Sequence, residues 1–442
     1  MKQTLIIFLY AISFFSCKEE KNKIAEHQLT TENLKENIDD YFSALNTIGK
    51  FNGVIYASKN NAKIISKAYN LKPNNNSSTY VSTESQFDIH SVSKLMAHYL
   101  IEKFELEGKV KKTQTLNDFI PSFPNGEKIT IDMLLHHTSG LPRSFDNIEG
   151  DEINLTSKQI IAYTKKQKLI FAPGTASQYS NVGYELVYYI IQEISNKTFA
   201  QCLTDELFKP LKMKNSGAHF YTKEKNIKHL AKNHEKQDTL ITQVDNILKD
   251  ELKTARIFST VNDLNIFLNH INKEPYASLL KTKDNVIEKS GGSDGIRVEI
   301  YTNLEYNYNY ILLANYEEIP FQQTVIDFTK ILENKPYDIP KELNRQPIDL
   351  QLNIIEKYIG SYSFADMGNL ELTFKVEDGN LVVYQDGENI AILKAETENT
   401  FFDDPKEPES FEFIDDKNGS FNVLMGWKGV KLKGLRNNTK KF

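Results

Sequence analysis

The chain has 442 residues, which is more than one compact core usually holds, so at least two domains are expected. Hydrophobic residues make up 40% and charged residues 25% of the chain, a composition that excludes a wholly disordered protein. The net charge is −6 and lysines alternate with acids throughout, which excludes a basic nucleic-acid-binding surface.

Residues 1–16 have the pattern of a secretory signal peptide. Lys2 gives a basic start, residues 4–15 are mostly apolar, and the small residue Ser16 follows. The apolar run is too short to span a bilayer comfortably. The sequence therefore predicts export from the cytoplasm.

Cys17 follows the signal directly and resembles the lipidated cysteine of bacterial lipoproteins, although Phe14 stands where that pattern prefers leucine. The resemblance implies a lipid anchor on Cys17, a polar tether over residues 17–30, and a place in the cell envelope at the outer membrane. An ordinary cleaved signal with a chance cysteine is the alternative. Cys202 is the one other cysteine, so lipidation of Cys17 excludes a disulfide within the chain. Cys202 itself is predicted to be a small buried residue in a helix.

The first elements after the tether are a helix and a hairpin. Apolar residues at helical spacing predict an amphipathic helix over 31–48. Two short apolar runs, 51–57 and 63–69, flank Asn60-Asn61, and asparagine tolerates the positive φ of a tight turn. A β-hairpin is therefore expected here, followed by an Asn- and Ser-rich loop over 71–80.

Two further helices and a strand pair are expected in the middle of the chain. A helix from Ser91 to about Leu106 has one apolar face, and its N-terminal N–H groups favour negative charge at Ser91. Another helix follows Asn181. Two strands are expected within 288–315, around a turn formed by Gly291-Gly292-Ser293-Asp294-Gly295.

The C-terminal part has a different pattern. Residues 335–348 contain three prolines and few apolar residues, as expected of an interdomain linker. Apolar and polar residues then alternate over short stretches, which predicts a small antiparallel barrel or sandwich. The expected strands lie at 370–376, 381–384, 389–395, 410–414, 420–426 and 429–433.

Three short elements carry the chemistry. Ser91 and Lys94 lie three residues apart, so on a helix the lysine amine can take the serine proton. Tyr179-Ser180-Asn181 and Lys289-Ser290-Gly291 follow in that order. Each element alone is equally a helix cap or a charged strand end, but the three in order predict a catalytic serine site.

At these residues the chain resembles the serine β-lactamase and penicillin-binding-protein superfamily, in its class C-like branch. Residues 87–94 resemble the nucleophile motif, 129–142 the LLxHTSGL segment, 173–181 the second motif and 289–292 the third, KTG-like motif. Residues 350–442 resemble the lipocalin-like β-domain often appended to such hydrolases.

The resemblance implies an α+β fold: an antiparallel sheet flanked by helices, with a helical subdomain and a small all-β barrel. It places the hydrolase at 31–334, the linker at 335–348 and the barrel at 349–442. Ser91 is expected to be the nucleophile. The implied proton-transfer and charge-stabilising residues are Lys94, Tyr179 and Lys289, and the implied substrate and oxyanion contacts are Asn181, Ser290, Gly291 and Gly292.

Physical chemistry supports these roles. The charges of Lys94 and Lys289 would lower the pKa of Tyr179 from about 10 and make it a better base. The sequence has no HExxH, CxxC pair or GxGxxG, so neither a metal nor a nucleotide cofactor is expected. His137 is predicted to be a structural histidine in a tight turn.

The expected function is a serine hydrolase that acts through an acyl-enzyme on a small molecule or peptide. β-Lactamases and penicillin-binding proteins carry lysine at the position that matches Lys289, whereas many related esterases carry histidine. The resemblance therefore implies a carboxylated substrate, such as a D-amino-acid peptide or a β-lactam. One alternative is a binding protein that deacylates slowly or does not react, acting as an envelope sensor. Another gives the C-terminal β-domain the main binding role. The oligomeric state stays open.

Overall fold

A computed structural model describes residues 31–72, 79–145, 157–219, 229–237, 240–244, 256–367, 370–417, 419–427 and 430–437. The predicted signal peptide, Cys17 and the tether lie outside the described residues, as does most of the predicted loop over 71–80. None of the helices within these ranges combines the length and apolar character that a membrane crossing requires.

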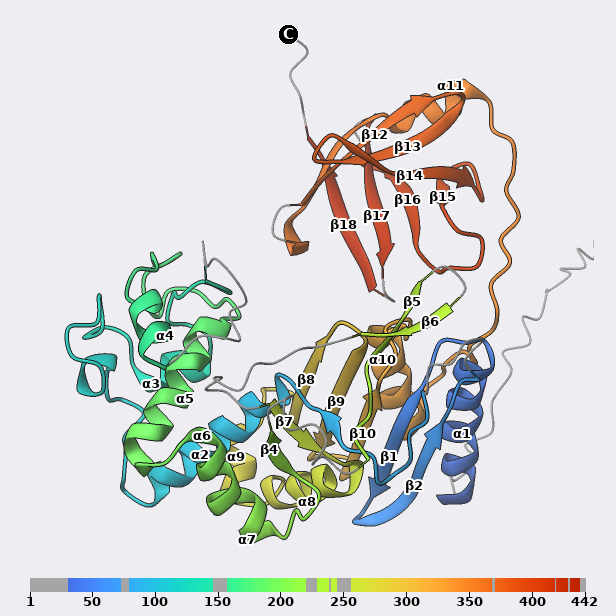
Figure 1. Ribbon diagram of the computed structural model, residues 1–442. Coiled ribbons are helices and arrows are strands. Elements are labelled where there is room, and N and C mark those ends of the chain that lie inside the picture. Colours follow the sequence, from blue (N-terminus) through green and yellow to red (C-terminus); the bar gives the residue numbers. More distant parts are fainter. Residues whose placement is uncertain are drawn as a thin grey trace, which may run out of the picture.

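A five-stranded sheet in the order β2-β1-β10-β9-β8 forms the centre of the N-terminal body (Figure 1). All neighbouring strands in it are antiparallel, and β1 pairs with β10 from Gly53 opposite Ala314 to Lys59 opposite Tyr308. The sheet thus joins two strands from residues 53–69 to three strands from residues 286–314. The strands are β1 (Gly53–Lys59), β2 (Ala62–Tyr69), β8 (Val286–Ser293), β9 (Ile296–Asn303) and β10 (Tyr308–Ala314).

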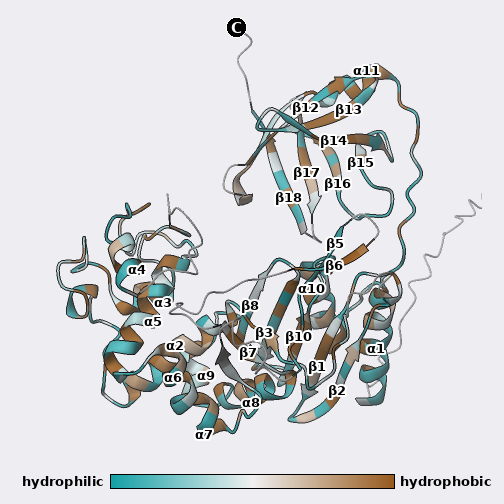
Figure 2. Ribbon diagram, viewed as in Figure 1, coloured by the Kyte–Doolittle hydropathy of each residue, from teal (hydrophilic) through white to brown (hydrophobic). Residues whose placement is uncertain are grey.

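Both faces of this sheet are covered by helices, and Figure 2 shows its strands as mostly apolar. On one face, α1 (Thr31–Thr47) and α10 (Phe321–Leu332) enclose a buried cluster that includes Phe42, Tyr310 and Phe328. On the other face, α2 (Val92–Leu106) and α8 (Val261–Ile271) contribute to a larger cluster. The edge strand β8 therefore lies next to α2, the helix that begins with the serine motif.

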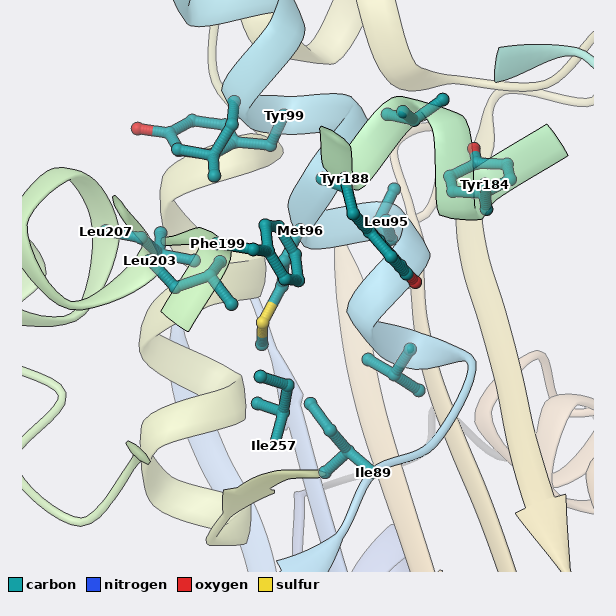
Figure 3. Close-up of a cluster of buried hydrophobic side chains, with 14 of the residues drawn as sticks. Ile89, Leu95, Met96, Tyr99, Tyr184, Tyr188, Phe199, Leu203, Leu207 and Ile257 are labelled. Carbon is teal, nitrogen blue, oxygen red and sulfur yellow. The ribbon is translucent and has the colours of Figure 1, made fainter. Parts of the chain in front are cut away.

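A helical region extends from α2 and holds the second motif. Ser180 caps α5 (Asn181–Ser195), since its hydroxyl accepts the Gly183 N–H at 2.9 Å. Figure 3 shows the apolar packing between these helices, with Leu95 and Met96 of α2 near Tyr188 and Phe199. The other helices are α3 (Ile131–Leu135), α4 (Ser157–Thr164), α6 (Phe199–Leu203), α7 (Lys209–Leu211) and α9 (Tyr276–Leu280).

Short strands complete the body. One strand of a three-stranded sheet comes just before α2 in the chain, and a two-stranded hairpin lies between the body and the C-terminal domain (Figure 1). They are β3 (Phe87–Asp88), β4 (Gly217–His219) and β7 (Arg256–Ser259), with β5 (His234–Gln237) and β6 (Leu240–Gln243) as the hairpin.

The predicted helix over 31–48 and the hairpin around Asn60-Asn61 are confirmed, with φ of 51° and 62° at the two asparagines. Cys202 is fully buried in α6, as predicted, and burial raises the pKa of its thiol to about 11. The prediction of two strands within 288–315 is wrong, because three strands lie there. The glycine run does not form the turn: Gly291 and Gly292 lie inside β8, and the turn is Asp294-Gly295.

Residues 335–347, all of them described, form neither helix nor strand and run to a closed eight-stranded barrel, which confirms the predicted fold class (Figure 1). Rings of Tyr358, Tyr362, Phe374 and Phe401 lie 4.4 to 5.8 Å from the ring of Phe413 and fill the interior. A short helix, α11 (Leu352–Ile355), precedes the barrel. The strands are β11 (Gly360–Phe364), β12 (Leu370–Glu377), β13 (Asn380–Gln385), β14 (Glu388–Ala395), β15 (Thr400–Phe402), β16 (Ser410–Asp415), β17 (Phe421–Trp427) and β18 (Val430–Arg436).

Candidate active site

Ser91 lies at the junction between the β3 turn and α2, where it occupies the N-cap position. Its hydroxyl makes no capping hydrogen bond to its own helix, so the oxygen is available to other groups. Tyr179 Oη lies 3.0 Å and Lys94 Nζ 3.1 Å from Ser91 Oγ. The structure thus brings the first and second predicted motifs into direct contact at the expected nucleophile.

Three cations surround the ring of Tyr179. Lys94 is 7% exposed, so its charge lies in a partly dehydrated environment, where electrostatic interactions are stronger. Arg143, which was not predicted as a site residue from the sequence, is exposed at the surface. The distances to the ring centroid are 5.5 Å from Lys94 Nζ, 5.2 Å from Lys289 Nζ and 5.3 Å from Arg143 Cζ.

Two of these cations, Lys94 and Lys289, lower the pKa of Tyr179. Burial alone raises that pKa, but the charge of Lys94, the hydrogen bond with Ser91 and the charge of Lys289 together outweigh burial and lower it. Burial lowers the pKa of Lys289, and the Lys94 charge adds to this, while Tyr179 acts in the opposite direction. The lowered pKa values of Tyr179 and Lys289 bring both groups closer to neutral pH, where acid–base catalysis is most effective.

His137 lies in a turn with φ of 59°, as the sequence predicted, and it packs against the same tyrosine. Its Nδ1 accepts the Ser180 N–H at 3.1 Å, and its ring centroid lies 4.5 Å from that of Tyr179. Burial, followed by the charges of Lys289 and Lys94, lowers the pKa of His137 to about 4. The imidazole is therefore neutral at pH 7 and positions the start of the second motif.

The third motif reaches Ser91 through Gly291. A Cβ on Gly291 would lie 2.4 Å from the Ile89 carbonyl oxygen and 3.0 Å from the Ser91 nitrogen, so only glycine fits. Gly292 also has little space for a side chain. A Cβ there would face Ile296 O at 2.8 Å and the Arg297 side chain, which belong to the sheet itself.

The pairing of β8 with β9 sets the direction of the Gly292 N–H. Ser293 and Ile296 flank the two-residue turn and form a hydrogen-bonded pair. Such pairs alternate along an antiparallel ladder, so Gly292 lies in a non-hydrogen-bonded pair with Arg297. Because β8 is an edge strand, the Gly292 N–H points away from β9, at the open edge of the sheet.

Ser290 and Asn181, the other expected substrate contacts, lie within two residues of Lys289 and Tyr179 in the chain. Ser290 is opposite Glu299, and strand alternation puts its side chain on the other face of β8 from Lys289. Glu299 is buried beside Ser290. Its burial raises its pKa to about 8, although a hydrogen bond with Ser290 acts to lower that pKa. Asn181 begins α5 and donates its backbone N–H to Arg143 O at 2.9 Å. Its side-chain amide makes no hydrogen bond with Lys94 among the described contacts.

No sequence pattern points to Arg143, since a surface arginine after a loop motif is common and its contact with Tyr179 depends on the fold. Within the ranges that the structure covers, no group of His, Cys, Asp and Glu side chains is arranged to hold a metal ion.

Comparisons with known proteins identify related sequences and a related fold. PbpX of Bacillus subtilis is 29% identical over 205 residues, which are 45% of this chain and 49% of that protein, so the chain spans about half of that relative. Penicillin-binding protein 4* of the same organism is 23% identical over 399 residues, 78% of this chain and 87% of that protein. A solved class C β-lactamase matches with a TM-score of 0.58 and 18% identity over 69% of this chain and 99% of that one, which shows a shared fold. The family described as Beta-lactamase matches residues 38–296, which contain Ser91, Lys94, Tyr179 and Lys289, and the chain belongs to that family.

Proposed function

We propose that this protein is a serine hydrolase that acts through an acyl-enzyme on Ser91. The observation that carries the proposal is the contact of Ser91 Oγ with both Tyr179 Oη and Lys94 Nζ, at 3.0 and 3.1 Å. A hydroxyl becomes an effective nucleophile when an adjacent base takes its proton. Tyr179, with its lowered pKa, and Lys94 are the groups that supply this base.

The proposed reaction has two steps. Ser91 Oγ attacks the substrate carbonyl as its proton passes to the Tyr179–Lys94 pair, and the same pair returns a proton to the leaving group. Water then hydrolyses the ester on Ser91 by the reverse transfer. The N–H groups of Ser91 and Gly292 are proposed to bind the oxyanion, and each such donor is worth roughly 10²–10³ in rate.

We propose a substrate with a carboxylate near the scissile bond, such as a D-amino-acid peptide or a β-lactam. Three cations surround Tyr179, and Arg143 is the exposed one. An exposed guanidinium can pair with a carboxylate through two parallel hydrogen bonds. Arg143 and Lys289 are therefore the proposed carboxylate contacts.

This assignment of Arg143 predicts a selective loss. In Arg143→Ala, KM for a carboxylated substrate should rise about tenfold, the size of one charge-assisted contact, while KM for a neutral ester stays within about twofold. Steady-state kinetics with a matched pair of acids and esters measures this. Lys165→Ala is the control, because Lys165 is another exposed cation that bonds Pro121 O. Equal changes for both substrates would refute carboxylate recognition by Arg143.

Covalent labelling tests the hydrolase proposal directly. Protein lacking residues 1–17 is treated with a fluorophosphonate and with a fluorescent penicillin, and adducts are mapped by mass spectrometry. Wild type and Ser177→Ala, an exposed serine two positions before Tyr179, should be labelled on Ser91, and Ser91→Ala should not. A penicillin adduct that persists for hours supports the alternative of a slowly deacylating sensor. Well-folded protein without any adduct would contradict the proposal.

We also propose export and lipid anchoring through Cys17, on the sequence pattern alone. In cells fed a labelled fatty acid, wild type should take up label and enter the membrane fraction, and Cys17→Ser should do neither. A wild type that stays unlabelled and appears as a soluble cleaved product would leave the ordinary signal peptide as the explanation.

A further inference from the structure

His90, the residue before the nucleophile, has a left-handed backbone with φ of 43°. Side chains with a Cβ adopt this region rarely, although histidine does so more often than most. Such a conformation persists only where its surroundings hold it, and it is concentrated at functional sites. The contacts of His90 therefore show what holds this turn.

Asp88 holds His90 from one side. Its Oδ1 accepts the His90 backbone N–H at 3.0 Å, and its Oδ2 lies 3.4 Å from His90 Nε2. The side chain of Asp88 is 2% exposed and that of His90 is 11% exposed, so the pair is shielded from water. A buried carboxylate with two donors on one residue fixes both the backbone and the ring of that residue.

The ring of His90 also reaches the third motif. Its Nε2 lies 3.4 Å from Ser293 Oγ, at the end of β8. The same turn meets β8 a second time at Gly291, where a Cβ would lie 3.3 Å from His90 Cβ. The two contacts fall on either side of Gly292, whose N–H is proposed to bind the oxyanion together with that of Ser91.

We propose that His90 is a positioning residue that ties the nucleophile turn to β8 through Ser293 and so fixes the spacing of the two oxyanion N–H groups. This inference rests on the proposed function. Donors that bind a developing oxyanion act through their geometry, and a small displacement lowers the rate of the chemical step more than substrate binding. His90 itself does not touch the substrate.

The test separates this role from a structural one by using two opposite substitutions. His90→Gly removes the tie but relieves the left-handed strain, which offsets the greater freedom of the unfolded chain. Its Tm should stay close to that of wild type, while the maximal rate of fluorophosphonate labelling falls at least about tenfold with KI unchanged. In His90→Gln, the side-chain amide nitrogen can occupy about the position of His90 Nε2, but glutamine adopts positive φ less readily than histidine. It should label within about threefold of wild type and have a lower Tm.

Lys212→Gly is the matched control, because Lys212 also has positive φ (59°) and lies at the end of α7. It should leave both Tm and the labelling rate close to wild type. Stability measurements test the contact between His90 and Ser293. Because the two side chains interact, the Tm shifts of His90→Ala and Ser293→Ala should not add in the double variant.

Additive Tm shifts, or a His90→Gly variant that labels at the wild-type rate, would overturn the inference. If wild type itself is not labelled, the proposed function fails, and the Tm cycle still decides whether His90 and Ser293 are coupled. The two failures are thus distinguishable.

Discussion

Tyr179 shares a hydrogen bond with Ser91 and lies in the field of Lys94 and Lys289, and these contacts determine its protonation. Burial opposes the lowering of its pKa, so the result depends on both lysines. A tyrosine with a lowered pKa accepts the Ser91 proton more readily at neutral pH than one with a pKa of about 10, which is a poor base.

Removal of the Lys289 charge should move the pH profile. In Lys289→Met the pKa of Tyr179 rises, because one of the charges that lower it is absent, so the rising limb of the labelling rate shifts to higher pH. Measurement of the labelling rate from pH 5 to about 10 tests this. Lys281→Met, an exposed lysine just before β8, should leave the profile in place. An unshifted Lys289→Met profile would show that Tyr179 is not the titrating base.

At this scale the sequence predicted the residues that belong to motifs but not their neighbours. The order of the three motifs identified Ser91, Lys94, Tyr179 and Lys289, which the structure brings together. Arg143 and the Asp88–His90 pair escaped prediction, because their contacts with the site exist only in the folded chain. Their side chains are of kinds that occur on any surface or turn.

The β8–β9 hairpin presents two chemically different faces. Lys289 faces α2 and the proposed nucleophile, and Glu299 of β9 is buried on the opposite face beside Ser290. A carboxyl group so enclosed keeps its proton, and its pKa rises to about 8. Folding therefore retains a proton that the unfolded chain releases near pH 4.5.

This retained proton predicts how stability depends on pH. The contribution of Glu299 is complete below pH 4.5 and is lost progressively as the pH rises to about 8, because only the unfolded chain ionises in that window. Glu299→Gln should raise the free energy of unfolding at pH 8 by about 2–4 kcal/mol and flatten its pH dependence. Urea unfolding between pH 4 and 9 measures this. Glu305→Gln, an exposed glutamate in the next turn, should leave the slope unchanged.

Elements with strong local patterns were predicted well. The β1–β2 hairpin and the helix at Ser91 have clear periodicity and turn residues, and both are confirmed. The three-strand arrangement at β8–β10 was missed because β10 is buried along its whole length and so lacks alternation. The short strand β15 was also not predicted, because three residues are too few to show an alternating pattern of apolar and polar residues.

The whole molecule has separate cores for its body and its barrel. The barrel cluster around Phe413 shares no residue with the two clusters of the body. One described contact between them is Lys50 Nζ, which lies 2.6 Å from Glu407 Oε2 of the β15–β16 loop and 3.5 Å from Glu318 Oε2. A partly exposed ion pair of this kind contributes at most about 1 kcal/mol.

The body should therefore keep its proposed reactivity without the barrel. A chain of residues 31–348 should be labelled on Ser91 within about threefold of the rate of the full chain, and its Tm should fall by only a few degrees, since few stabilising contacts are lost. Full-length Lys50→Ala shows how much of that fall comes from the ion pair alone. A folded but unreactive body would assign the barrel a direct part in the site.

The close approach of Gly291 to the Ile89 carbonyl and the Ser91 nitrogen also constrains how this protein can change by mutation. A side chain at 291 has no space unless the turn at 89–91 moves, and any such movement displaces the proposed nucleophile. Substitutions at these two places, far apart in the gene, are therefore tolerated only together. Neutral substitutions should therefore be rare in these two segments and should accumulate elsewhere on the surface of the protein.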